Sequence, residues 1–208
     1  MAALVRTLRV LAWAHAFTEL HIRNVTHPRA AARQLSSHTT HACDRAANAK
    51  RFYEIALDAR SATTSPTDKV TQHAYETMYG LFLMPLRHAR HVRMLEIGLG
   101  CNMGYGPGAS VSVWQRLLPD AELWEAEFDA ECVEAARAKG QLDGVRTLTG
   151  DQGDPATLEG WKRALGGELD VVIDDGGHKN SQLGASFDAL WPLVKLGGVY
   201  VLEDLQFG

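Results

Sequence analysis

The sequence predicts an α/β fold built on one doubly wound, mostly parallel sheet. From about Ser61 onward, short apolar stretches that run into glycines or acids alternate with amphipathic segments of helical periodicity. This alternation is typical of right-handed βαβ crossovers, which place helices on both faces of a parallel sheet. With 208 residues, 46% of them hydrophobic, the chain can build a core of the size that such a sheet needs.

The elements follow one another in a regular order. A helical segment over residues 65–82 begins with the turn and cap residues Ser65, Pro66, Thr67 and Asp68. Five strands are then predicted, in the stretches VRMLEIGLG (92–100), AELWEAEFD (121–129), GVRTLTGD (144–151), LDVVIDDGG (169–177) and GGVYVLEDL (197–205). Helices lie between them, over 109–118, 129–140, 157–167 and 181–194.

Acidic residues recur at or just beyond the ends of these strands. They are Glu96, Glu127, Asp151, Asp174 and Glu203. Ligands of parallel α/β sheets bind beyond the carboxyl ends of the strands, so these acids are predicted to share one rim. Because like charges repel at close range, such a rim favours a cationic or hydrogen-bonding ligand, whereas a merely solvated rim predicts scattered charges.

A glycine-rich loop, LEIGLGCNMGYGPGAS, follows the first strand. Gly98 and Gly100 allow a tight turn and close approach of a ligand to the backbone, which nicotinamide, flavin and S-adenosylmethionine enzymes all use. Glu96, two residues before Gly98, suits the ammonium group of a methionine-type cofactor. Met103 stands where the dinucleotide GxGxxG pattern has its third glycine, which disfavours a dinucleotide.

Two later strand ends supply further cofactor candidates. Glu127 is placed to accept hydrogen bonds from ribose hydroxyls, a role that a dinucleotide would also give it. Asp151 and Gln152 follow the third strand and are placed to meet an adenine edge.

The stretches DVVIDDGGHKNSQ and YVLEDLQ gather acids and one histidine at two neighbouring strand ends. Asp175, Glu203 and Asp204 offer the oxygen ligands that Mg²⁺ prefers, and His178 could take a proton near neutral pH. The alternative is a set of solvated loop charges with a capping histidine. Glu203 and Asp204 point to opposite faces of a regular strand, so both can bind one ion only if the backbone turns there.

These motifs together resemble the class I S-adenosylmethionine-dependent methyltransferases. More narrowly, PTDKVTQHAYETMY, LEIGLG, GDQGDP, IDDGGH and GGVYVLEDLQ resemble the Mg²⁺-dependent macrolide sugar O-methyltransferases and the related cephalosporin-hydroxylase-like group, over about 140 of the 208 residues. The resemblance implies that Asp175, Glu203 and Asp204 bind Mg²⁺ and that His178 is the general base. Asp174 is expected to be a cofactor-side or structural carboxylate and not a metal ligand. The resemblance also implies a small-molecule acceptor with a hydroxyl group or vicinal diol, and it sets Asp68 and Lys69 near the active site. Without the resemblance, Asp68 and Lys69 would be interpreted as a helix cap and a solvated charge.

The sequence departs from the family at its end. A class I sheet has seven strands, the last two of which form an antiparallel hairpin beside strand five, whereas this sequence ends shortly after EDLQ. We therefore expect the C-terminal hairpin to be absent and strand five to be a bare edge that favours homo-oligomers. The missing hairpin keeps open a non-catalytic binding module, and a nicotinamide-dependent oxidoreductase is a further alternative. Such an oxidoreductase would not need the acids and the histidine of the DDGGH and ED motifs.

Residues 1–60 are predicted to be an N-terminal extension and residues 61–208 the methyltransferase domain. The first 50 residues carry seven Lys and Arg but only two acids, a composition typical of a mitochondrial transit peptide; otherwise we expect a cytoplasmic protein. Charges interrupt every window long enough to span a membrane, and the net charge of −4 does not indicate nucleic-acid binding. Cys43, Cys101 and Cys132 form no CxxC pair, so we expect free thiols in a reducing compartment.

Overall fold

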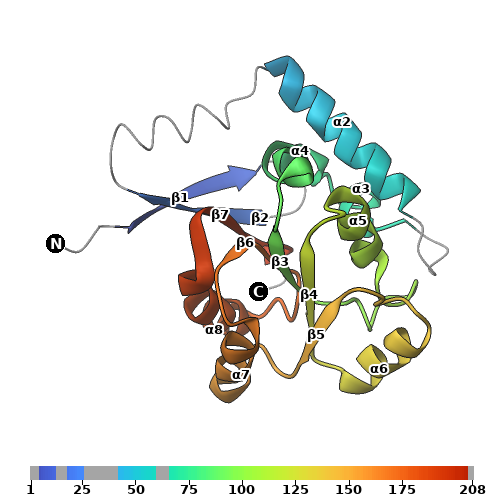
Figure 1. Ribbon diagram of the computed structural model, residues 1–208, viewed down its shortest axis with the longest axis vertical. Coiled ribbons are helices and arrows are strands. Elements are labelled where there is room, and N and C mark those ends of the chain that lie inside the picture. Colours follow the sequence, from blue (N-terminus) through green and yellow to red (C-terminus); the bar gives the residue numbers. More distant parts are fainter. Residues whose placement is uncertain (1–4, 13–17, 26–41, 60–65, 206–208) are drawn as a thin grey trace.

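The protein is described by a computed structural model over residues 5–12, 18–25, 42–59 and 66–205. Its sheet has seven strands in the order β1-β2-β7-β6-β3-β4-β5 (Figure 1). The five predicted strands are all present and parallel to one another: β3 (Arg93–Ile97), β4 (Glu122–Glu127), β5 (Arg146–Thr149), β6 (Leu169–Asp174) and β7 (Val194–Leu202). The predicted doubly wound α/β fold is therefore confirmed.

The central strands bury side chains on both faces. Along β6, Val171 and Ile173 pack into one hydrophobic layer and Val172 packs into the other. The same alternation continues in β7, where Val201 and Tyr200 face opposite layers. Helices cover both faces of these central strands, so side chains on both faces are buried. This explains the continuous apolar runs in the sequence.

Helices cover the two faces in two groups. The first layer is formed with α2 (Ala42–Asp58), α4 (Glu76–Phe82) and α5 (Ala109–Leu117), and the second with α7 (Pro155–Leu165) and α8 (Asn180–Leu190) (Figure 1). A short helix, α3 (Asp68–Thr71), and a 3₁₀ turn, η1 (Met84–His88), lie before β3; α6 (Ala130–Ala138) follows β4, and η2 (Trp191–Leu193) precedes β7. In the described part of the chain, no helix is long and apolar enough to cross a membrane.

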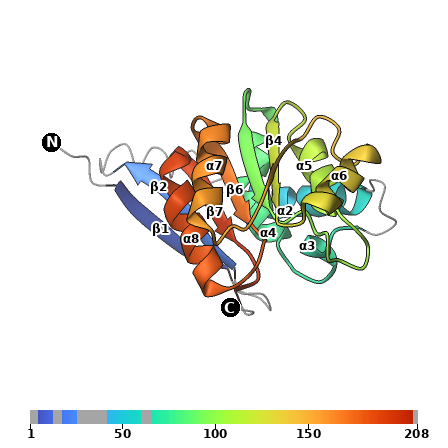
Figure 2. The same ribbon diagram turned by 90° about the horizontal axis from the view of Figure 1, so that it is seen from below.

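The edge beside β7 differs from the prediction. An N-terminal hairpin of β1 (Val5–Ala12) and β2 (Thr18–Val25) joins the sheet there, and β2 pairs antiparallel with β7 from Glu19↔Leu202 to Ile22↔Val199 (Figure 2). The expectation of a bare edge at the fifth parallel strand was wrong, because backbone groups of β2 pair with those of β7.

Part of the predicted N-terminal extension packs on the domain. Phe52 and Ala56 of α2 are fully buried in the layer that also contains Tyr79 of α4 and Trp114 of α5. The ring centroids of Phe52 and Tyr79 lie 5.2 Å apart. The transit-peptide interpretation concerns residues that lie partly outside the described ones, and it stays a prediction, as does the division at residue 60.

Candidate functional site

A cavity of about 640 Å³ opens at the carboxyl ends of the parallel strands. Its wall is formed by the loops that follow β3, β4, β5 and β6, by α3 and by the turn after β7. Among the predicted site residues, Gly98, Gly100, Glu127, Asp151, Gln152, Asp175, His178 and Asp204 line it. The cavity therefore lies where the rule that ligands bind beyond the carboxyl ends of the strands predicts a site.

Gly98 allows two of these loops to meet. Its φ of +106° is rarely adopted by other residues, and a Cβ at this position would lie 2.1 Å from the carbonyl oxygen of Asp175. The amide of Asp175 donates to the carbonyl of Ile97 at 2.9 Å, so the glycine loop and the DDGGH turn are in direct contact. Only glycine fits this crossing.

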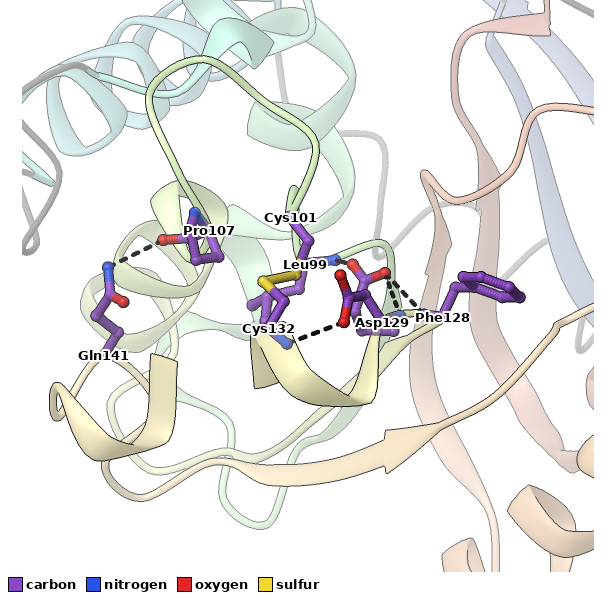
Figure 3. Close-up of a disulfide and its surroundings, with 8 residues drawn as sticks. Leu99, Cys101, Pro107, Phe128, Asp129, Cys132 and Gln141 are labelled. Atoms are coloured by element: carbon purple, nitrogen blue, oxygen red, sulfur yellow. Dashed lines mark hydrogen bonds between the residues drawn. A yellow bond between two sulfur atoms is a disulfide. The ribbon is translucent and has the colours of Figure 1, made fainter. Parts of the chain in front are cut away.

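Glu127 lies at the point where the glycine loop meets the segment after β4. Its Oε2 accepts a hydrogen bond from the amide of Leu99 at 3.0 Å, and its Oε1 accepts from the amides of Phe128 and Asp129 at 2.7 and 3.1 Å (Figure 3). Three backbone donors fix the carboxylate in place, on the wall of the cavity. This position agrees with the predicted contact to ribose hydroxyls.

A disulfide joins the same two segments. Cys101 of the glycine loop is bonded to Cys132 in the first turn of α6, with the two Cα atoms 6.1 Å apart (Figure 3). The prediction of free thiols was wrong for these two cysteines. They are 31 residues apart in the sequence, and only the packing of α6 beside the loop brings them together.

Asp151 is held by its own loop and by α8, and Gln152 is held by residues at and after the end of β6. Asp151 Oδ1 accepts from the amide of Gly153 at 2.7 Å and from Gln182 at 3.1 Å, and these hydrogen bonds lower the pKa of Asp151. Gln152 donates to Asp174 Oδ1 at 2.9 Å and accepts from the amide of Gly177 at 2.8 Å. Gln152 therefore links the loop after β5 to the loop after β6, while Asp151 borders the cavity.

Two predicted cofactor residues, Glu96 and Asp174, lie behind the wall instead of on it. Both are fully buried. Glu96 Oε2 accepts from Ser110 and from Trp114 Nε1, both at 2.7 Å. Asp174 accepts from Gln152, Ser186 and Tyr200, and burial raises its pKa.

Asp175, His178 and Asp204 form the group of metal-ligating type at the cavity. One ligand atom from each lies within 4.8 Å of those of the other two. Asp175 Oδ1 and His178 Nε2 are 3.9 Å apart. His178 and Asp204 both have a φ of +54°, and at Asp204 the backbone therefore departs from regular strand geometry.

Glu203, the third ligand implied by the resemblance, faces the interior. It is 1% exposed, and one oxygen accepts from Lys69 Nζ at 2.6 Å while the other accepts from the Tyr79 hydroxyl. Within the described residues it is not one of the acids grouped with His178. Its assignment as a ligand stays a prediction.

Lys69 lies among these acids. It is 1% exposed, and its Nζ lies 2.7 Å from Asp175 Oδ2 and 3.3 Å from Glu96 Oε1, in addition to Glu203. Burial alone would lower the pKa of Lys69, but the carboxylates of Asp175, Glu203 and Glu96 raise it well above its ordinary value. The interpretation of Lys69 as a solvated charge was wrong; it lines the cavity, and the place near the active site that the resemblance implies stays a prediction.

The segment before β3 contributes more to the site than the sequence alone indicated. Tyr75 donates to Asp204 Oδ1 at 2.7 Å, and His73 Nδ1 lies 3.7 Å from the same oxygen. Tyr105, in the glycine loop, borders the cavity beside Asp68, and burial together with that carboxylate raises the pKa of Tyr105. The capping pattern before α3 predicted that this segment is helical, but it did not indicate which residues the segment contacts.

Several curated proteins similar to this chain are O-methyltransferases. The 8-demethyl-8-α-L-rhamnosyl tetracenomycin-C 2′-O-methyltransferase of Streptomyces olivaceus is 33% identical over 144 residues, which cover 67% of this chain and 35% of that protein. The mycinamicin VI 2″-O-methyltransferase of Micromonospora griseorubida is 37% identical over 121 residues, 56% of this chain and 28% of the relative. No protein-family profile matches the chain.

A solved structure agrees with these relatives. MycE methyltransferase from the mycinamycin pathway, in complex with Mg, SAH and mycinamycin VI, superposes with a TM-score of 0.57 at 28% identity, covering 78% of this chain and 37% of MycE. This chain has the class I methyltransferase fold and is related to the sugar O-methyltransferases. The chain spans about a third of the length of these two curated relatives.

Proposed function

We propose that the protein is an S-adenosylmethionine-dependent O-methyltransferase that uses Mg²⁺ to methylate a hydroxyl group of a small molecule or sugar. The observation that carries the proposal is the convergence of Asp175, His178 and Asp204 on one cavity, next to the glycine loop. The relatives that act on sugar hydroxyls, and MycE with Mg and SAH, support the same chemistry.

The cavity fits the cofactor in size and in its polar groups. At about 640 Å³ it lies within the usual range for small-molecule sites. Gly98 and Gly100 bring the backbone close to the cavity, Glu127 would accept from the ribose hydroxyls, and Asp151 would meet the adenine edge. The methionine end would lie toward Asp68 and Tyr105, since Glu96 is buried behind Ser110 and Trp114.

The acids fit a magnesium ion. Asp175 and Asp204 offer the hard oxygen ligands that Mg²⁺ prefers. The imidazole nitrogen of His178 is a poor ligand for Mg²⁺, so His178 would remain available to accept a proton. When bound, Mg²⁺ would orient the acceptor and acidify its hydroxyl group. His178 would remove that proton as general base, and the nearby Asp175 carboxylate would stabilise the imidazolium that results.

Two alternatives make different predictions. A nicotinamide-dependent oxidoreductase would bind NAD⁺ and would not need the DDGGH and ED acids. A non-catalytic module would bind the cofactor or a partner without methyl transfer. The grouping of His178 with two acids on the cavity wall favours the enzyme over both.

Titration calorimetry of the chain with S-adenosylmethionine and with NAD⁺, each with and without Mg²⁺, tests the proposal. We expect S-adenosylmethionine to bind selectively, and Mg²⁺ binding to weaken at least about tenfold in Asp175→Asn and Asp204→Asn. Asp188→Asn, on the exposed surface of α8, is the matched control and should leave Mg²⁺ affinity unchanged. Binding of NAD⁺ in preference to S-adenosylmethionine, or a folded chain that binds neither, would overturn the proposal.

A further inference from the structure

We infer that Lys69 is a positioning residue for the Mg²⁺ site: it fixes the carboxylate of Asp175 and neutralises Glu203. The inference rests on the proposed function and concerns a residue that would touch neither the acceptor nor the methyl group. Lys69 would act through Asp175, whose second oxygen faces His178.

The ammonium group of Lys69 lies among three carboxylates. Its Nζ donates hydrogen bonds to Asp175 Oδ2 at 2.7 Å and to Glu203 Oε2 at 2.6 Å, and these two acids directly follow β6 and β7. Glu96 Oε1, near the end of β3, lies 3.3 Å from Nζ as an ion pair and has no hydrogen-bond partner among the described residues. Lys69 thereby links the side chains that follow two neighbouring strands, whose backbones are already paired in the sheet.

The cation itself is held firmly. Thr67 accepts a hydrogen bond from the amide of Lys69, and the carbonyl of Lys69 accepts from the amide of Tyr75 at 3.2 Å. Its Nζ also lies 6.0 Å from the centroid of the Trp114 ring, whose Nε1 donates to Glu96. A buried and anchored ammonium can define the orientation of a carboxylate, whereas a solvated lysine could not.

The orientation of Asp175 is the property at stake. With Oδ2 held by Lys69, the carboxylate has Oδ1 left toward His178 and the cavity. The same segment also supplies Tyr75 to Asp204 and Tyr79 to Glu203, so each predicted metal acid has a partner from residues 69–79. Partners that orient metal ligands typically change metal affinity by about 10–100-fold when they are removed.

The test compares Mg²⁺ affinity, by titration calorimetry, in wild type, Lys69→Gln, Glu203→Gln and the double variant Lys69→Met/Glu203→Gln. Loss of Lys69 alone leaves three acids without their cation and can unfold the chain. The double variant reduces this penalty because it removes the charge of the buried Glu203 together with that of Lys69. Circular dichroism establishes that each variant is folded. The affinity of S-adenosylmethionine is measured alongside.

We expect Mg²⁺ to bind the double variant about 10–100-fold more weakly than it binds Glu203→Gln, which keeps the contact between Lys69 and Asp175. Equal Mg²⁺ affinities for these two folded variants would show a purely structural role and overturn the inference. Tighter binding without Lys69 would show that the ammonium competes with the metal, and this result also overturns it. If wild type binds S-adenosylmethionine but no Mg²⁺, the metal-dependent part of the proposed function fails, and the inference fails with it.

Discussion

Gly98 shows how a single missing side chain holds the site together. The carbonyl of Asp175 occupies the space that a Cβ would need, so the contact between the cofactor loop and the DDGGH turn depends on glycine at this position. The sequence indicated a glycine for close approach to a ligand. The structure adds that the closest neighbour is the protein's own backbone.

The substitution Gly98→Ala is expected to lower the free energy of unfolding by about 3 kcal/mol or more, because it combines an unfavourable φ with a backbone clash. It should also weaken S-adenosylmethionine binding by displacing the loop. Denaturant unfolding and titration calorimetry measure the two effects. In the control, Gly160→Ala, the added methyl group within α7 meets nothing within 4 Å and should stabilise the chain by about 0.5–1 kcal/mol.

Among the elements, the glycine loop and α6 are coupled by covalent and hydrogen bonds. Asp129 caps α6 by accepting from the amide of Cys132, and Cys132 is bonded to Cys101 in the loop. Glu127 accepts hydrogen bonds from backbone on both sides of this connection. The disulfide thus joins the two segments whose backbone amides hold the Glu127 carboxylate, which is predicted to bind ribose.

Reduction by a dithiol is expected to weaken S-adenosylmethionine binding about tenfold, since the released loop must be ordered when the ligand binds. Stability should fall by about 2–4 kcal/mol, because the unfolded chain loses a crosslink. Cys132→Ser should show both effects without reductant and should no longer respond to it. Cys43→Ser is the control: it leaves the disulfide intact and should respond like wild type. An unchanged affinity after complete reduction, verified by thiol titration, would contradict this prediction.

At the scale of the whole molecule, the hairpin of β1 and β2 extends the sheet beyond β7. A class I sheet has an antiparallel hairpin beside its fifth parallel strand, and here β2 runs antiparallel to β7 at that edge with β1 outside it. The hairpin comes from the opposite end of the chain, and it pairs with the same backbone groups that a C-terminal hairpin would use.

Deletion of residues 1–25 is expected to lower the melting temperature and to make the chain self-associate through the uncovered edge of β7. Thermal unfolding and light scattering after size exclusion, at several protein concentrations, measure this. The transit-peptide interpretation makes the opposite prediction. A shortened chain that stays monomeric and as stable as the full chain would favour it.

The sequence by itself determined the α/β class, the succession of the five parallel strands along the chain and the edge of the sheet at which the cavity lies. These follow from local signals: continuous apolar runs, helical periodicity, glycines after the first strand, and acids at consecutive strand ends. A parallel sheet converts the last of these into a cluster, because its carboxyl ends meet at one edge. Asp175 and Asp204 follow two of these strand ends, and their roles, like that of His178, stay predictions that rest on the resemblance.

Only the tertiary structure decided how Lys69, Glu203, the two bonded cysteines and the first strands are used. Lys69 contacts acids more than 100 residues away, and Cys101 meets a cysteine that no motif marks as its partner. The pairing of β2 with β7 likewise joins the two ends of the chain. Such contacts depend on which surfaces pack together once the sheet has formed. Local sequence patterns do not indicate which residues far apart in the sequence will meet.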